Sequence, residues 1–169
     1  MIYSLEENKA VVVDYIRTAR WDIAFSDIYR SFISGNNSTG LGNFGAGGPG
    51  KGGVYLLEKK FDEVIDIPAD GLFKTGLAVY GTDISGAFGD GPGWYQYDFD
   101  GTLRSDGRYE KQHVAYPIEN RTVIVRTAKG NYAKIRMLSI YKDELNPDKW
   151  FRDSPAPYFT FDYVLVKAG

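Results

Sequence analysis

The segment that decides the fold class reads Arg121-Thr-Val-Ile-Val-Arg-Thr127, then Ala128-Lys-Gly130, then Asn131-Tyr-Ala-Lys-Ile-Arg-Met-Leu-Ser-Ile-Tyr141. Its first arm contains Val123-Ile124-Val125, and β-branched side chains are stiff at χ1 and well suited to a pleated strand. Lys129-Gly130-Asn131 has the composition of a tight turn, because glycine adopts positive φ without steric cost and asparagine tolerates it. The segment therefore predicts a β-hairpin.

The second arm of this hairpin is apolar on both faces. Ala133, Ile135 and Met137 alternate onto one strand face, and Leu138 and Ile140 belong to the other. A strand that is apolar on both faces is typical of the interior of a sheet. We therefore expect the hairpin to lie in the middle of a sheet.

Other apolar runs, separated by Gly, Pro and Asp, predict further strands. They are Lys9–Arg17, Trp21–Phe25, Ile28–Ile33, Trp94–Tyr97, Val114–Ile118 and Tyr158–Val166. Period-two alternation places two sets of side chains on common faces: Trp21, Ile23 and Phe25, expected in the core, and Phe159, Phe161, Tyr163 and Leu165.

Two glycine-rich stretches, 34–53 and 81–93, predict long loops, since they offer almost no large side chains for a core. Leu56–Phe61 carries a weak signal for one or two helical turns. The chain is therefore predicted to be all-β: a single antiparallel β-rich domain over residues 1–169, with long Gly-rich loops and at most one short helix.

Composition narrows the function classes. A length of 169 residues suits one domain with its own core. The net charge of -2 and pI of about 5.4 argue against nucleic acid as a partner, because the chain has no excess of positive charge to bind phosphates. No run of about 18 apolar residues occurs, so no membrane-spanning segment is expected. The first eight residues lack the basic and apolar regions of a signal peptide.

The chain has no cysteine and one histidine, His113. Disulfides, thiolate metal sites and three-histidine zinc sites are therefore excluded. His113 stands at a predicted strand entrance, where it is either a partly exposed hydrogen-bonding residue or a ligand. Met137, in the middle of a predicted strand, is expected to fill space in the core.

Asp98-Phe-Asp-Gly-Thr-Leu103 matches the nucleophile motif of the HAD phosphatases, in which one carboxylate is phosphorylated and the second moves the proton. That chemistry needs a parallel strand before the motif and a helix after it. Here the flanking residues predict an antiparallel strand and a polar turn. Catalysis by Asp98 and Asp100 is therefore a remote hypothesis.

Two matches to phosphate-binding loops fall inside the first Gly-rich stretch. Gly45–Gly52 approximates a P-loop, but the magnesium-binding Ser/Thr is replaced by Gly52. Gly40–Gly45 fits the dinucleotide fingerprint but lacks the helix that would receive a pyrophosphate. Both are interpreted as accidents of composition.

Several segments, in order along nearly the whole chain, resemble the HmuY-like proteins of Bacteroidetes. They are Trp21–Phe25, the Asn/Gly-rich loop after Ile33, Phe61–Val64 before Pro68, Trp94–Tyr97 and the hairpin Thr127–Ile135. The resemblance implies an all-β fold and haem binding between two axial side chains. It also implies an outer-membrane lipoprotein or a secreted haemophore, which takes haem from host carriers and delivers it to an outer-membrane receptor.

The resemblance also implies a site. His113 lies where the second axial ligand is expected, and it is the predicted metal ligand. The first ligand is expected near Gly81–Gly93, which contains neither His nor Met. The predicted haem-binding residues are His113, Tyr116, Tyr80, Tyr95 and Met137. The candidate walls are Tyr80, Phe88, Trp94, Tyr95 and Tyr116.

Three functions follow in order of preference. The first is a non-enzymatic haem- or porphyrin-binding protein of the cell envelope. The second is the same fold without haem, used as a cell-surface module that binds glycan or protein. The third is the HAD-type phosphatase with Asp98 and Asp100.

Overall fold

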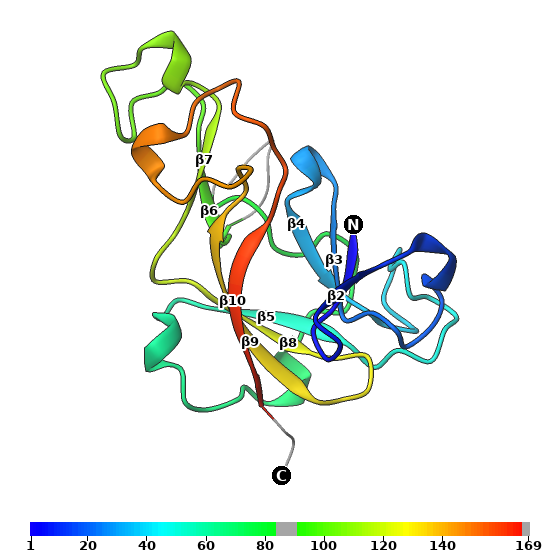
Figure 1. The fold of residues 1–169 in the computed structure, drawn as a ribbon. Helices are drawn as coiled ribbons and strands as arrows, with labels where there is room; N and C mark the ends of the chain where they lie inside the picture. The colour runs from blue at the N-terminus through cyan, green and yellow to red at the C-terminus, as the bar shows by residue number, and fades with distance from the viewer. Residues whose placement is uncertain (84–90, 167–169) are drawn as a thin grey trace.

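The structure is a computed structural model that describes residues 1–83 and 91–166. Its strands pair antiparallel into three sheets (Figure 1). The first sheet has the order β2-β1-β3-β4 and consists of β1 (Ile2–Ser4), β2 (Lys9–Val11), β3 (Ile23–Ser26) and β4 (Phe32–Gly35). The second has the order β10-β9-β8-β5 and consists of β5 (Gly53–Leu57), β8 (Thr122–Arg126), β9 (Tyr132–Ser139) and β10 (Thr160–Val166). The third is a ribbon of β6 (Tyr95–Asp98) and β7 (Val114–Pro117).

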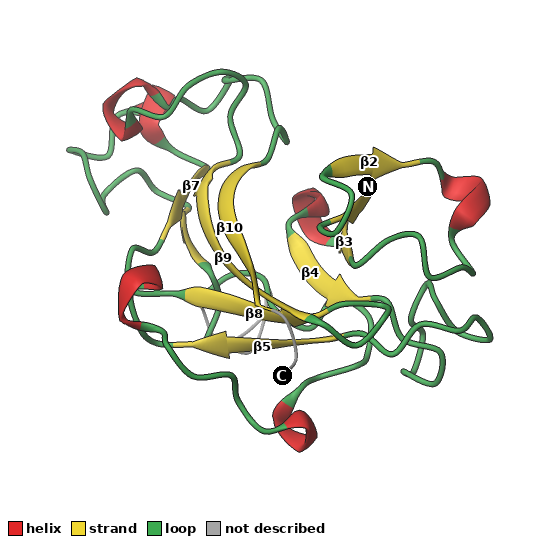
Figure 2. Cartoon of the chain, turned by 60° about the horizontal axis from the view of Figure 1, so that its bottom comes forward, coloured by secondary structure: helices red, strands yellow, loops and turns green. Residues whose placement is uncertain are grey.

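The helical elements of the described residues are single 3₁₀ turns at the periphery (Figure 2). They are η1 (Val13–Tyr15), η2 (Ile28–Arg30), η3 (Phe61–Glu63), η4 (Asp70–Leu72), η5 (Tyr109–Lys111) and η6 (Pro147–Lys149). The all-β prediction is confirmed.

The predicted hairpin is the centre of the second sheet. β8 and β9 pair with Val123 opposite Ile135 and Val125 opposite Ala133, and they are the two inner strands. The turn closes where the Thr127 N–H donates to the Asn131 carbonyl at 2.7 Å. Gly130 has φ of +91°, which is the backbone conformation expected of it.

The two faces of β9 follow the prediction as far as Leu138. Ala133, Ile135 and Met137 are buried on one face, and Leu138 is half-buried on the other. Ile140 lies one residue beyond the strand end and is buried in the main core. That core draws side chains from all three sheets.

The strand predicted over Lys9–Arg17 was wrong beyond Val11. Its partner β1, which was not predicted, reaches only from Ile2, opposite Val11, to Ser4. Past that point the backbone bonds locally, and the Tyr15 N–H donates to Val12 O at 3.1 Å. The length of the partner strand therefore ended β2.

Two further boundaries were wrong. Ile28–Ile33 was predicted as one strand, but Tyr29 and Arg30 have positive φ of 52° and 55°, and β4 starts only at Phe32. Leu56–Phe61 was predicted as helix, but Leu56 pairs with Val123 in β5. Pairing at the sheet edge outweighed the local helix signal.

The loop predicted over residues 34–53 covers only 36–52, because β4 includes Ser34 and Gly35 and β5 starts at Gly53. Buried asparagines organise this loop. Asn37 Oδ1 accepts hydrogen bonds from Thr39 N–H at 2.9 Å and Gly40 N–H at 2.8 Å, and Asn43 Nδ2 donates to Gly35 O at 2.7 Å. These amide groups satisfy backbone atoms that strands would otherwise pair. The loop is thereby held without a hydrophobic core of its own.

The predicted faces in β3 and β10 are largely confirmed. Trp21, Ile23 and Phe25 are all buried, but Trp21 packs in a separate cluster with Ile2 and Ala24. Along the last strand Phe159, Phe161 and Tyr163 pack against the main core, whereas Leu165 is 42% exposed.

A buried carboxylate, Asp22, joins the first two sheets. Its Oδ2 accepts a hydrogen bond from Leu5 N–H at 2.7 Å, and its Oδ1 accepts one from Ala128 N–H, in the β8–β9 turn, at 3.0 Å. Burial raises the pKa of Asp22, and the backbone N–H groups that donate to it oppose the rise. Asp22 therefore couples the β1–β2 turn to the central hairpin.

We expect Asp22→Asn to lower the free energy of unfolding by about 2–3 kcal/mol, because an amide NH₂ cannot accept from the N–H groups that it would face. The control is Asp162→Asn, which removes an exposed ion pair with Arg136 and should cost no more than about 1 kcal/mol. Urea denaturation of both variants at pH 7 measures the difference. A smaller loss for Asp22→Asn than for Asp162→Asn would contradict this role.

Candidate functional site

The β6–β7 ribbon presents one polar aromatic face. Tyr95 and Tyr97 lie two residues apart on β6, and Tyr97 is opposite Ala115 of β7. His113, just before β7, lies at the same face, because its Nδ1 is 2.8 Å from the Tyr97 hydroxyl. His113 itself has φ of +60°, which marks the turn into β7.

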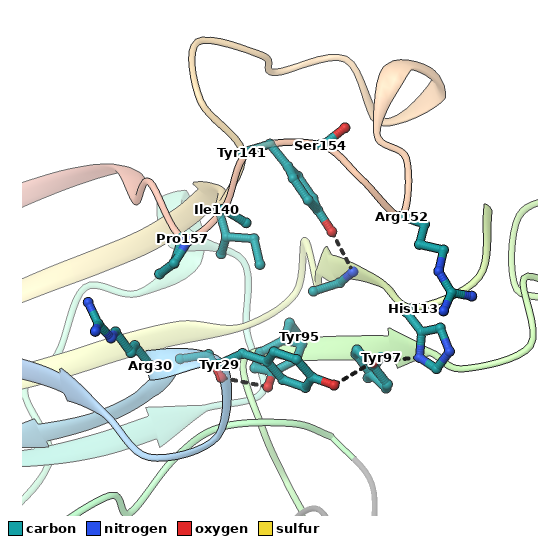
Figure 3. Close-up of a pocket in the computed structure, with 13 residues that line it drawn as sticks. Tyr29, Arg30, Tyr95, Tyr97, His113, Ile140, Tyr141, Arg152, Ser154 and Pro157 are labelled. Atoms are coloured by element: carbon teal, nitrogen blue, oxygen red, sulfur yellow. Dashed lines mark hydrogen bonds between the residues drawn. The ribbon is translucent and has the colours of Figure 1, made fainter. Parts of the chain in front are cut away.

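This face is one wall of a cavity of about 490 Å³ (Figure 3). That volume lies within the range of small-molecule sites. In Figure 3, Tyr29, Tyr95 and Tyr97 lie below, and Ile140, Tyr141 and Pro157 lie above. The other lining residues are Arg30, Ser31, His113, Ala115, Arg152, Ser154 and Ala156.

A chain of hydrogen bonds runs along the cavity wall. The hydroxyls of Tyr29 and Tyr97 are 3.0 Å apart, and the Tyr97 hydroxyl is 2.8 Å from His113 Nδ1. The Tyr29 ring also stacks on Tyr97, with centroids 5.4 Å apart. The other ring nitrogen of His113, Nε2, makes no hydrogen bond with a described residue.

The tyrosines around the cavity resist ionisation. Burial raises the pKa of Tyr95 and of Tyr141 to about 12. Burial, and then the hydrogen bond with Tyr29, raise the pKa of Tyr97. Tyr95 shares a hydrogen bond with Ser31 Oγ at 2.7 Å, and the Tyr141 hydroxyl accepts one from Ala115 N–H at 2.9 Å. These rings are therefore neutral, fixed surfaces at physiological pH.

Two arginines supply the charge of this cavity. Arg30 and Arg152 lie at opposite ends of it in Figure 3, and the lining contains no Asp or Glu. Arg152 stacks over the Tyr109 ring at 4.2 Å from its centroid. Aromatic walls with cationic ends suit a flat apolar ligand that carries anionic groups.

The model of the HmuY protein family matches residues 1–163. The chain belongs to the HmuY family. HmuY proteins are haem-binding, haemophore-like and generally non-enzymatic, and they are typically cell-surface lipoproteins. A search of the curated proteins finds no match.

Within residues 1–83 and 91–166, none of the helical segments has the length and apolar character that spanning a membrane requires. Nor does any group of three or more His, Asp or Glu side chains gather there to hold a metal ion.

The structure brings His113 and Tyr95 together in the cavity and places the other predicted haem-binding residues elsewhere in this HmuY chain. Tyr116 is on the opposite face of β7, where its ring lies 5.7 Å from that of Trp150. Tyr80 bridges to Ile33 beside β4. Met137 lies in the main core.

A further predicted wall, Trp94, is not among the residues that line the cavity. Trp94 is buried behind the cavity, where its Nε1–H donates to Ser31 O at 2.8 Å. Phe88 lies outside the described residues.

Among the cavity residues that sequence reasoning missed, five have aromatic or charged side chains: Tyr29, Arg30, Tyr97, Tyr141 and Arg152. Tyr97 carried a usable signal, since it lies two residues from Tyr95 in a predicted strand. Tyr29 and Arg30 were assigned to a strand that does not form there. Tyr141 and Arg152 come from the segment after β9, which only tertiary folding brings to the ribbon.

The phosphatase motif of this HmuY chain is in the wrong setting for that chemistry. Asp98 ends β6, which is antiparallel to β7, and single 3₁₀ turns are the only helices in the described residues. The parallel strand and the following helix that the motif requires are both absent from that part. The stretches resembling phosphate-binding loops likewise lie between β4 and β5 without a helix after them.

We expect the folded protein to lose stability between pH 10 and 12, partly through Tyr95. Below pH 10 the Tyr95 phenol is protonated in both the folded and the unfolded protein. Above pH 10 it ionises in the unfolded chain, whereas in the folded protein its pKa is about 12, so rising pH favours unfolding. Denaturant titrations across this range should show a smaller loss in Tyr95→Phe, by at most roughly 2–3 kcal/mol. Tyr109→Phe, at an exposed ring, should follow the wild type. Equal pH dependence in wild type and Tyr95→Phe would contradict the burial of this phenol.

Proposed function

We propose that this protein binds haem or a related porphyrin in the tyrosine-lined cavity, without catalysing a reaction, and that His113 is the axial ligand. One observation carries the proposal. The only histidine in the chain lines the cavity with Nδ1 held 2.8 Å from the Tyr97 hydroxyl. A histidine that binds a metal through one ring nitrogen generally makes a hydrogen bond with the other nitrogen, and this bond orients the ring.

The residues present fit such a ligand. A porphyrin is a flat apolar ring with carboxylate groups, and haem adds an iron that accepts an imidazole nitrogen. Tyr95, Tyr97 and Tyr141 offer aromatic surface, while Arg30 and Arg152 offer positive charge for the carboxylates. The other side of the iron would be open or would face a phenol such as that of Tyr95.

The setting that we propose comes from the family. HmuY proteins are typically cell-surface lipoproteins. We therefore place this chain, with residues 1–169 acting as one domain, in the cell envelope as an outer-membrane lipoprotein or a secreted haemophore. Its partners would be a host haem carrier and an outer-membrane receptor.

A second function is supported by a different feature, the exposed aromatic rim of the cavity. Tyr29, Phe99 and Tyr109 are 57%, 62% and 67% exposed. Tyr29 lines the cavity, Phe99 packs on His113, and Tyr109 stacks with Arg152. Exposed rings of this kind also suit a glycan or protein at the cell surface.

We expect a hemin titration, followed at the Soret band, to saturate at about one equivalent for the wild type. His113→Ala should change the Soret maximum and weaken binding at least roughly tenfold, a loss of about 1.4 kcal/mol, because the iron loses its nitrogen ligand. Met137→Leu, a volume-conserving change away from the cavity, is the matched control and should leave the spectrum unchanged.

Two results would contradict the proposal, the first for haem itself and the second for its site. A wild-type response no larger than that of an unrelated protein would favour the glycan- or protein-binding function. An unaltered spectrum in His113→Ala, with a changed one in Met137→Leu, would move the ligand away from this cavity.

A further inference from the structure

Two phenols and the histidine of the cavity form one hydrogen-bonded chain (Figure 3). The Tyr97 hydroxyl is 3.0 Å from the Tyr29 hydroxyl and 2.8 Å from His113 Nδ1. A phenol has one hydrogen, so Tyr97 can donate to only one of these two partners. The direction of its bond decides which ring nitrogen of a neutral His113 carries a hydrogen.

The two directions have opposite consequences for His113. If Tyr97 donates to Nδ1, the imidazole carries its hydrogen on Nε2, and Nε2 has no lone pair for a metal. If Tyr97 donates to Tyr29, it accepts from Nδ1–H, and the lone pair lies on Nε2. Tyr29 is 57% exposed, so water can complete the chain in either direction. The surroundings of the chain therefore decide between the two.

The charges around the cavity favour the direction from Tyr97 to Tyr29. Arg30 and Arg152 line the cavity together with His113, and the described lining residues include no Asp or Glu. A guanidinium group is positive and only donates hydrogen bonds. A positive potential stabilises a nitrogen lone pair and opposes an N–H group that faces it. Because Nδ1 is engaged with Tyr97, the lone pair belongs on Nε2.

The backbone and the neighbouring rings hold this chain in place. Three lining residues, Tyr29, Arg30 and His113, have positive φ of 52°, 55° and 60°. Tyrosine and arginine seldom adopt such values, and residues that do so cluster at functional sites. The Tyr29 ring stacks on Tyr97 at an interplanar angle of 24°, and Phe99 meets the imidazole edge-on at 80°. The hydroxyls and Nδ1 are thereby kept facing one another.

We propose that Tyr97 is a positioning residue, which accepts a hydrogen bond from His113 Nδ1–H and donates its own hydrogen to Tyr29. It thereby holds the neutral imidazole in the tautomer whose Nε2 has the lone pair. The inference rests on the proposed function for its purpose, since a nitrogen that binds iron needs that lone pair. The protein without ligand already has the ligating tautomer, so binding requires no transfer of hydrogen between the ring nitrogens.

The test is nuclear magnetic resonance of the ¹⁵N-labelled protein without hemin, at about pH 8, where a histidine side chain is ordinarily neutral. His113 is the only histidine in the chain, so its ring gives a single set of long-range hydrogen–nitrogen correlations. We expect the hydrogen on Nδ1 in the wild type. Tyr97→Phe should move it to Nε2, because Nδ1 loses its acceptor and a histidine in water favours Nε2–H. Tyr95→Phe, at a buried phenol of the same strand that bonds Ser31 instead, is the matched control and should keep the wild-type tautomer.

Tyr29→Phe, at an exposed ring, keeps the test decisive if Tyr97→Phe does not fold. Without the Tyr29 hydroxyl, Tyr97 is expected to donate to Nδ1, so this variant should carry more of its hydrogen on Nε2. A wild type with the hydrogen on Nε2 would overturn the proposal. So would a folded Tyr97→Phe, or in its absence a Tyr29→Phe, that keeps the wild-type tautomer.

A hemin titration of the same proteins separates this inference from the proposed function. Tyr97→Phe should weaken hemin binding roughly tenfold, the lower end of the loss seen when a metal-binding histidine is deprived of its hydrogen-bond partner. A wild type that holds Nδ1–H but does not bind hemin would contradict the haem proposal alone. Undiminished hemin binding by Tyr97→Phe, with the tautomer changed, would overturn the positioning role.

Discussion

The arrangement of the sheets depends on the buried carboxylate of Asp22. Its two oxygens accept backbone hydrogen bonds from the β1–β2 turn at Leu5 and from the β8–β9 turn at Ala128. The first sheet is therefore docked against the central hairpin at a fixed point. Tyr29 and Arg30 follow β3 of the first sheet, and Tyr141 follows β9 of the second. The hydrogen bonds of Asp22 therefore also hold together the two segments that line the cavity opposite the β6–β7 ribbon.

The candidate site follows from alternation on a two-stranded ribbon. Tyr95 and Tyr97 share a face with His113, and the Tyr97 hydroxyl holds the imidazole from one side. Phe99 packs on the same ring from the loop beyond β6. His113 is therefore already oriented by Tyr97 and Phe99, and it loses little further side-chain entropy when a ligand binds. A specific small-molecule site requires side chains that are fixed in this way.

Local patterns in the sequence predicted the parts of the fold that depend on local chemistry. Val123–Val125 and Gly130 predicted the hairpin, because β-branched residues and a positive-φ turn act over a few positions. The end of β2 at Val11 could not be predicted, since the length of its partner strand decides it. Positive φ at Tyr29 and Arg30 had no signal, because residues other than Gly, Asn, Asp and His seldom adopt it.

The site was predictable only in part. His113 and Tyr95 were identified, and Tyr97 follows from its spacing to Tyr95. Tyr116 follows Ala115 in β7, so alternation places it on the face opposite that of Ala115 and Tyr97. Tyr141 and Arg152 reach the cavity through tertiary packing. The most direct measurement is a crystal structure of the protein with hemin, using the anomalous signal of iron. The account predicts one iron beside His113 within the cavity; an iron beside Met137 or Tyr80, or on the outer surface, would contradict it.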